Sequence, residues 1–473
     1  MSMGNRPTEH QESFWIETSS LARSSGHPFY EKLNAILKKH GFDEMAEAAC
    51  VAFYRQGVGR PSTPPGVYFR MLFVGFFEGI DSERGIAWRT ADSMALRSFL
   101  GYGLDETTPD HSNLSRTRNR IDLDTHQTIF DWVLATLAKE GLLKGKSLGI
   151  DATTLEANAA LRSIVRRDTG ENYDEFLDGL AKASGVETPT REDRSKIDKK
   201  RKGKGSNKDW KSPSDPDARI TKMKDGRTHL AHKAEHAIDM DTGALVAVTL
   251  QGANLGDTTT VHETVASSKN NLSQAAREPG ARKNMKPLRE TICDKGYHGS
   301  ECLIELQREQ NLSTYIAEPK RGRRKWKNKH AQREATYTNR RHIKSERGKA
   351  LMRKRGELVE RSFAHVYDTG AMRRTHLRGH QNILKRLLIH AAGFNLSLIL
   401  RQTIGHGTPR GAKGTKSLIA LTKNLIMALQ RPLTALKKLK RRHHESETHP
   451  DFQKRTTNIF FQSRLKHAFA TDC

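Results

Sequence analysis

Two short apolar runs that each end in an aspartate constrain the fold of this chain most strongly. One run leads into Asp151 and the other leads into Asp294. Runs of this length predict buried strands, and the carboxyl end of a strand is where an α/β sheet most often carries its chemistry. The two carboxylates are therefore the first candidates for functional residues.

The segment from residue 146 to about residue 316 has the pattern of a sheet with interspersed helices. Helical patterns are expected at residues 153–162 and 300–310, and Asp241-Thr242-Gly243 supplies the turn of a hairpin. Strands followed by helices predict an α/β (α+β) domain with a mixed sheet and flanking helices. The expected strands are residues 147–151, 228–239, 244–251, 289–294 and 312–316.

Residues 27–140 have helical patterns instead. One helix is expected to start at Asp110 or Ser112, either of which can act as the N-cap. Its exposed positions carry residue types that contact phosphates and base edges in DNA. The alternative is an ordinary solvated helix face that packs through its apolar positions. The residues in question are Ser112, Asn113, Arg116 and Arg118.

The charge of the chain indicates a polyanionic partner. The 473 residues include 81 Lys and Arg against 54 Asp and Glu, which gives a formal net charge of +27. Such an excess favours nucleic acid, because each neutralised phosphate releases counterions. A merely solubilising surface is the less favoured alternative.

Three basic regions accompany this charge. Residues 163–225 are polar, with a Lys-rich centre at 199–206, and this composition predicts a mobile insertion without a core or a loop that touches DNA. Residues 320–355 form a second basic stretch. From residue 401 the tail combines basic residues with leucines at helical spacing, which suits a dimer element, a DNA clamp or a plain docking helix.

Other features exclude several classes of protein. The four cysteines form no CxxC pair, which argues against a zinc ribbon and a disulfide framework and favours a reducing compartment. No apolar signal segment opens the chain, and the apolar runs near residues 71–77 and 387–400 are too short or too interrupted for a membrane span. We therefore expect a cytoplasmic bacterial protein, associated with the nucleoid, with no membrane partner.

Glu360, in a helix-like segment, is the third candidate carboxylate. Carboxylate oxygens are the hard ligands that Mg²⁺ prefers, and two metal ions can activate a nucleophile and stabilise a leaving oxygen at a phosphodiester. Two aspartates and a glutamate that converge from separate positions suit such a centre.

The residues around these carboxylates resemble the insertion-sequence transposases of the DDE class, which have a ribonuclease H-like catalytic domain. Gly149-Ile150-Asp151-Ala152-Thr153 is similar to the family's first-aspartate strand, and Asp294-Lys295-Gly296-Tyr297-His298 to its second-aspartate motif. Val359-Glu360-Arg361-Ser362-Phe363 resembles the glutamate motif, and the match extends through Phe394-Asn395-Leu396. Tyr367 stands where many relatives carry a lysine seven residues after the glutamate.

The resemblance implies a DNA transposase that hydrolyses the phosphodiester at element ends and transfers the freed 3′-hydroxyl strand into target DNA. Asp151, Asp294 and Glu360 would hold Mg²⁺, with Mn²⁺ as a substitute, and Arg361 and Arg373 would be among the basic residues that contact the DNA end. The partners would be double-stranded DNA and further copies of the chain. The expected domains are a helical DNA-end-binding region (1–140), a catalytic domain (141–400) with a charged insertion at about 163–227, and a basic helical tail (401–473).

Two alternatives remain open from the sequence. A metal-dependent nuclease without strand transfer would share the three carboxylates. A sequence-specific DNA-binding protein with a decayed catalytic domain would not need them.

Overall fold

The computed structural model describes residues 28–413, apart from residues 56–61, 104, 202–204, 224, 321 and 323. All of the elements below belong to one compact unit, Met1–Ala412. The tail helices expected beyond residue 413 lie outside the described residues.

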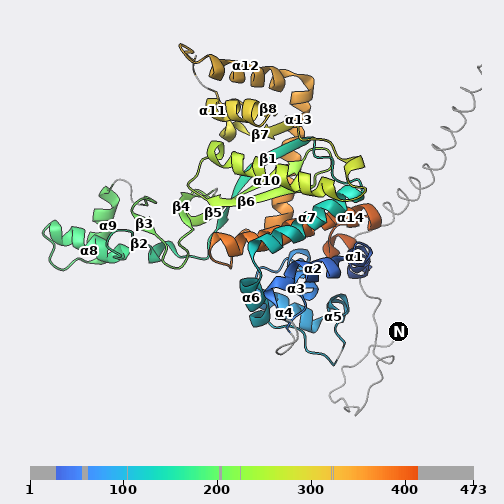
Figure 1. Cartoon of the computed structure of the whole chain (residues 1–473). Coiled ribbons are helices and arrows are strands. Elements are labelled where there is room, and N and C mark those ends of the chain that lie inside the picture. The colour runs from blue at the N-terminus through green and yellow to red at the C-terminus, as the bar shows by residue number, and fades with distance from the viewer. Residues whose placement is uncertain are drawn as a thin grey trace, which may run out of the picture. The chain divides into compact units, whose positions relative to one another are not determined.

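The N-terminal part of this unit is helical, as its sequence predicts (Figure 1). Pro65 opens α3 at a position where its missing N–H costs nothing, and Gly79, with a φ of 68°, ends that helix. Asp110 caps α6, as expected, by accepting a hydrogen bond of 2.8 Å from the Asn113 N–H. The helices are α1 (Pro28–Lys39), α2 (Phe42–Cys50), α3 (Pro65–Glu78), α4 (Glu83–Asp92), α5 (Met94–Leu100), α6 (His111–Arg120) and α7 (Leu123–Lys139).

A mixed sheet follows, in the order β4-β5-β1-β7-β8, with β6 also paired to β5. β1 is antiparallel to β5 and parallel to β7, and β8 is parallel to β7. This arrangement confirms the expected ribonuclease H-like α/β (α+β) class and the expected β5–β6 hairpin. The strands are β1 (Ser147–Glu156), β4 (Arg219–Lys222), β5 (Thr228–Asp239), β6 (Leu245–Gly252), β7 (Glu290–Cys293) and β8 (Ser313–Ile316).

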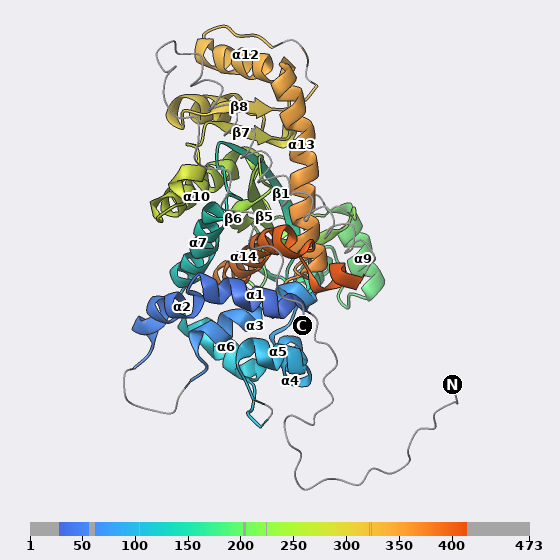
Figure 2. The same ribbon diagram turned by 90° about the vertical axis from the view of Figure 1, so that its right-hand side faces the viewer.

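Helices cover both faces of the sheet, and the contacts of its strands identify the helix on each face. A Cβ on Gly149 would lie 3.3 Å from Arg355 Cγ and 3.6 Å from Val359 Cγ2, so this face of β1 meets α13 (Figure 2). The opposite face meets α10, whose Thr260 bonds Glu235 of β5. Because strand side chains alternate, Asp151 shares the α13 face with Gly149. The helices around this sheet are α10 (Asp257–Arg277), α11 (Ser300–Ile304), α12 (His330–Lys344), α13 (Glu346–Phe363) and α14 (His380–Ile404), with π-helical turns η6 (Glu305–Glu309) and η7 (Ala364–Thr369).

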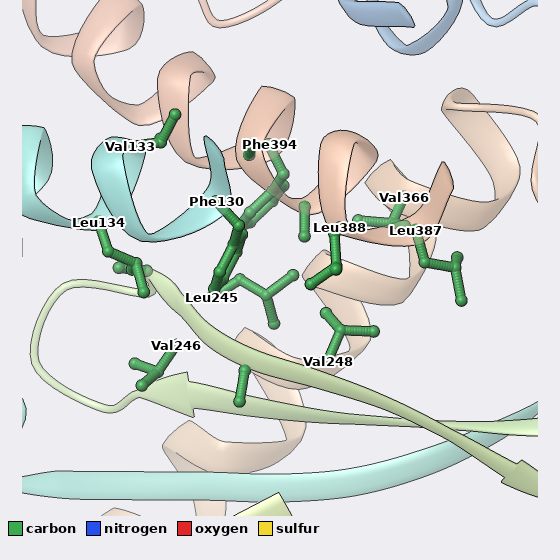
Figure 3. Packing of buried hydrophobic residues seen from close by; sticks show 14 of the residues in the cluster. Phe130, Val133, Leu134, Leu245, Val246, Val248, Val366, Leu387, Leu388 and Phe394 are labelled. Carbon is green, nitrogen blue, oxygen red and sulfur yellow. The ribbon is translucent and has the colours of Figure 1, made fainter. Parts of the chain in front are cut away.

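The main core lies where α7 and α14 pack together and α14 packs on β6. Phe130 of α7 and Phe394 of α14 are buried beside Leu245 and Val248 of β6 (Figure 3). α14 is long and apolar enough to cross a membrane by length and composition alone, but 89% of its most apolar window is buried inside the protein. It therefore has the character of a core helix.

Two sequence expectations in this region are wrong. The helix expected at residues 153–162 does not form, because β1 continues to Glu156 and pairs with β5 from Leu148 to that end. Thr153 and Thr154 are β-branched and suit a strand, and the long partner strand decides the outcome.

The charged insertion does bury a small core, contrary to expectation. Trp210 is 1% exposed, and its ring centroid lies 5.0 Å from Tyr173 and 5.4 Å from Phe176. The Arg201 guanidinium lies 4.7 Å from the Phe176 centroid. A few aromatic side chains bury enough area, with cation–π support, to order a segment whose composition is otherwise polar. Its elements are α8 (Tyr173–Ala183), α9 (Arg191–Lys200), β2 (Val165–Arg166) and β3 (Trp210–Lys211).

Asn395 provides a test of how α14 is joined to the sheet. Its buried amide donates to the Leu245 carbonyl at 2.8 Å and accepts from the Leu245 N–H at 2.9 Å. Asn395→Leu leaves both backbone groups unpaired, so we expect the free energy of unfolding to fall by roughly 2–4 kcal/mol in urea denaturation. Gln381→Leu, at an exposed position of the same helix, is the control and should change stability by less than about 0.5 kcal/mol. An equal, small effect of both variants would contradict this role of Asn395.

Candidate active site

Asp151 lies within β1 and points toward α13. Its Oδ2 accepts a hydrogen bond of 2.6 Å from Arg355 Nη1, and its Oδ1 accepts one of 2.8 Å from the Ala152 N–H. Burial raises the pKa of Asp151, Arg355 opposes that shift, and the neighbouring charge of Asp294 adds to it. Asp151 is thus a partly buried carboxylate that interacts electrostatically with a second one.

The parallel pairing of β1 with β7 places Asp294 beside Asp151. Ile150 is the register partner of Cys293, so Asp151 and Asp294 are the next residues on two adjacent strands that run in the same direction. Asp294 then begins the 3₁₀ turn η5 (Lys295–Tyr297), where its Oδ1 accepts a hydrogen bond of 2.7 Å from the Gly296 N–H. The structure therefore brings the two sequence-predicted aspartates together.

Glu360 lies on α13 at an exposed position, one residue after Val359, which packs on β1. Among the described residues there is no group of three His, Cys, Asp or Glu side chains placed to hold one metal ion. The structure thus places Glu360 on the helix that crosses the first aspartate strand, but does not gather it with the two aspartates into one cluster.

His236 supports the α13 side of this site, and sequence reasoning missed it. It is the β5 partner of Asp151, and its ring nitrogens lie 2.9 Å from Ser362 Oγ and 2.6 Å from the Tyr367 hydroxyl. These bonds hold the last turn of α13, which carries Glu360, against the sheet. Tyr367 is buried here, which explains how an aromatic residue suits a position where relatives carry a lysine.

Glu235 was also missed. It is buried in the centre of β5, on the α10 face, and accepts a hydrogen bond of 2.8 Å from the Tyr297 hydroxyl. A single glutamate in an apolar strand pattern gives no signal in one sequence, because its partners are remote in the chain. Its position gives the tyrosine of the second-aspartate motif a structural role.

The basic residues expected to contact DNA have different surroundings. The Arg373 Nη1 donates to Thr153 Oγ1 at 3.1 Å, so this side chain lies beside the first aspartate strand. Arg361 is exposed on α13 and pairs with Glu357.

On α6, Arg116 is exposed and bonds Ser112 Oγ at 2.8 Å, while Asn113 is half-buried. Arg118 instead pairs with Glu83 of α4 at 2.8 Å with only 11% of its side chain exposed. The expected exposed face therefore does not include Arg118, since an ion pair between helices holds it.

The donor set suits a divalent cation that prefers oxygen. Mg²⁺ is commonly held by one or two carboxylates together with substrate phosphates and water. Asp151 and Asp294 provide two such carboxylates side by side. Burial, with a smaller contribution from Asp294, raises the pKa of Asp151, and a nearby cation would offset both effects.

Comparison with protein families agrees with this geometry. Residues 19–120 match the family described as Transposase domain (DUF772), and residues 184–396 match the Transposase DDE domain. The chain belongs to the insertion-sequence DDE transposases. Asp294 and Glu360 lie inside the second match, whereas Asp151 precedes it. No curated protein and no solved structure shows significant similarity to this transposase.

The buried His236 of the transposase predicts acid sensitivity. Burial lowers its pKa to about 3, whereas an exposed histidine in the unfolded chain titrates near 6.5. Below pH 6.5, His236 is therefore protonated in the unfolded chain but stays neutral in the folded protein. The free energy of unfolding falls as pH decreases from 6.5 toward 3.

His236→Gln should remove this contribution. Between pH 6.5 and pH 5.0, we expect the wild type to lose roughly 2 kcal/mol more of its unfolding free energy in urea than the variant does. His330→Gln, at an exposed position, is the control and should follow the wild type. Parallel pH profiles for wild type and His236→Gln would show that the histidine is not held neutral.

Proposed function

We propose that this transposase binds the ends of its element, hydrolyses the phosphodiester there and joins the freed 3′-hydroxyl strand to target DNA. The observation that carries the proposal is the placement of Asp151 and Asp294 on adjacent parallel strands of a ribonuclease H-like sheet. The family supports a transposase in general terms. The individual steps and the residue roles below are our proposal.

Asp151 and Asp294 hold the divalent metal, with Mg²⁺ as the expected ion and Mn²⁺ as its substitute. When bound, the metal supplies activation of the attacking oxygen and stabilisation of the leaving oxygen. Glu360 provides the third carboxylate from α13, whose last turn is fixed by the bond between Ser362 and His236. Arg355 pairs with Asp151 at 2.6 Å, and we propose that it turns toward a DNA phosphate when a cation takes its place beside Asp151.

The DNA contacts follow from charge and exposure. Arg373 lies beside β1 and Arg361 lies on the α13 surface, so both suit the DNA end near the carboxylates. Arg116, with Ser112 and Asn113, belongs to α6 in the N-terminal helical part and suits recognition of the element end. We further propose that copies of the chain assemble on the DNA in the cytoplasm, because joining two element ends requires both to be held together.

Amide variants test this function directly. Asp151→Asn, Asp294→Asn and Glu360→Gln keep side-chain shape but remove the charge that holds the metal. Each should lower Mg²⁺-dependent cleavage of DNA carrying an element end by more than about 100-fold, beyond the 10–100-fold typical of groups that only support metal ligands. Binding to the same DNA, measured by fluorescence anisotropy, should remain.

Two matched variants control for loss of a surface carboxylate. Asp241→Asn lies in the exposed β5–β6 turn, and Glu346→Gln lies at the exposed start of α13. Both should cleave at the wild-type rate. A residue whose amide variant cleaves normally has no metal role, and cleavage without any joining of the 3′ end to a target plasmid would identify a nuclease instead of a transposase.

A further inference from the structure

Asp257, the first residue of α10, has a side chain with an unusual environment. Aspartates in the first turn of a helix commonly face solvent and only complement the helix dipole. Here Asp257 Oδ1 accepts a hydrogen bond of 2.5 Å from Nζ of Lys233, a lysine of β5 that is only 6% exposed. The carboxylate is thus fixed from one side by a buried cation.

The other oxygen of Asp257 lies against the Asp294 turn. A Cβ on Gly296 would lie 2.3 Å from Asp257 Oδ2 and 3.0 Å from Asp294 Oδ1. Both carboxylates therefore approach the same point, and a larger residue at position 296 would require the Asp257 carboxylate to shift. The lack of a side chain at Gly296 leaves room for the Asp257 carboxylate beside the Asp294 turn.

A closed ring of contacts connects Asp257 back to the same turn. Lys233 Nζ also donates to Thr260 Oγ1 at 2.9 Å, and that hydroxyl donates to Glu235 Oε1 at 2.9 Å. Glu235 in turn accepts from the Tyr297 hydroxyl at 2.8 Å, and Tyr297 is the residue after Gly296. The turn that carries Asp294 therefore packs against Asp257 at Gly296 and is hydrogen-bonded to Glu235 through Tyr297.

We propose that Asp257 and Lys233 are positioning residues for the metal centre. Asp257 fixes the Asp294 turn so that its carboxylate stays beside that of Asp151, and Lys233 neutralises Asp257 so that it does not compete for the cation. This inference rests on the proposed role of Asp294 as a metal ligand. Asp257 and Lys233 would thus support the carboxylates that the sequence motifs identify, without binding the metal themselves.

Direct metal binding is the decisive readout, because a purely structural pair would change stability without changing metal affinity. We would titrate the full chain with Mn²⁺, without DNA, and follow free Mn²⁺ by electron paramagnetic resonance. Asp257→Asn keeps the shape of the side chain but removes the nearer of the two carboxylates around Lys233, since Glu235 Oε1 lies 4.0 Å from its Nζ. Its Mn²⁺ dissociation constant should rise about 10-fold or more, as for other groups that support metal ligands.

A double variant separates positioning from folding. Lys233→Met/Asp257→Leu removes both charges of this partly buried ion pair, and replacement of buried ion pairs by apolar residues is often neutral for stability. It should fold with a melting temperature close to that of the wild type, yet bind Mn²⁺ about 10-fold more weakly and need correspondingly more Mn²⁺ for cleavage. Wild-type Mn²⁺ affinity in this folded variant would overturn the proposal.

Glu290→Gln is the matched control. Glu290 starts β7, the strand that leads to Asp294, and pairs with Arg347 at 2.6 Å at the opposite end of the strand. Its loss should lower stability but leave Mn²⁺ affinity unchanged, and equal weakening by Glu290→Gln would attribute the effect to general loosening and overturn the proposal. Asp294→Asn distinguishes the proposed function from the positioning role. If this variant binds Mn²⁺ normally, the proposed function itself fails. If it abolishes Mn²⁺ binding while Asp257→Asn does not weaken binding, only the positioning role fails.

Discussion

The parallel pairing of β1 with β7 determines where the acidic residues of this protein meet. Ile150 lies opposite Cys293, and the two aspartates follow directly. A slip of one residue in this register would move one carboxylate by about 3.3 Å and turn it to the other face of the sheet. The register is in turn protected by β5, which pairs with β1 from Leu148 to Glu156.

Two carboxylates side by side in a partly buried place destabilise one another unless a cation is near. Arg355 provides that charge for Asp151, and burial together with Asp294 keeps the pKa of Asp151 raised in spite of it. Contacts in the surrounding fold offset this repulsion. α13 packs on β1, His236 is bonded to the end of α13, and Glu235 accepts a hydrogen bond from Tyr297. Such repulsion is common at active sites, and in the proposed function it favours a divalent metal beside the two carboxylates.

Much of this arrangement could be predicted from the sequence, because its signals are local. The strand that contains Asp151, the strand that leads into Asp294, the β5–β6 turn and the Asp110 cap all depend on residues close together in the chain. What could not be predicted depends on remote partners. The extension of β1 follows from β5, the insertion's core depends on Trp210 meeting Tyr173 and Phe176, and Arg118 is held by Glu83 of another helix. The buried Glu235 and Lys233 gave no signal for the same reason.

The central claim is that Asp151 and Asp294 together bind the divalent metal. Anomalous diffraction from crystals of the full chain soaked in Mn²⁺ tests it most directly, because Mn²⁺ reports its own position. We predict a peak between the two carboxylates, at oxygen-ligand distances of about 2.0–2.3 Å, that disappears in Asp294→Asn. A bound Mn²⁺ that contacts neither aspartate, or one that persists unchanged in Asp294→Asn, would contradict the account.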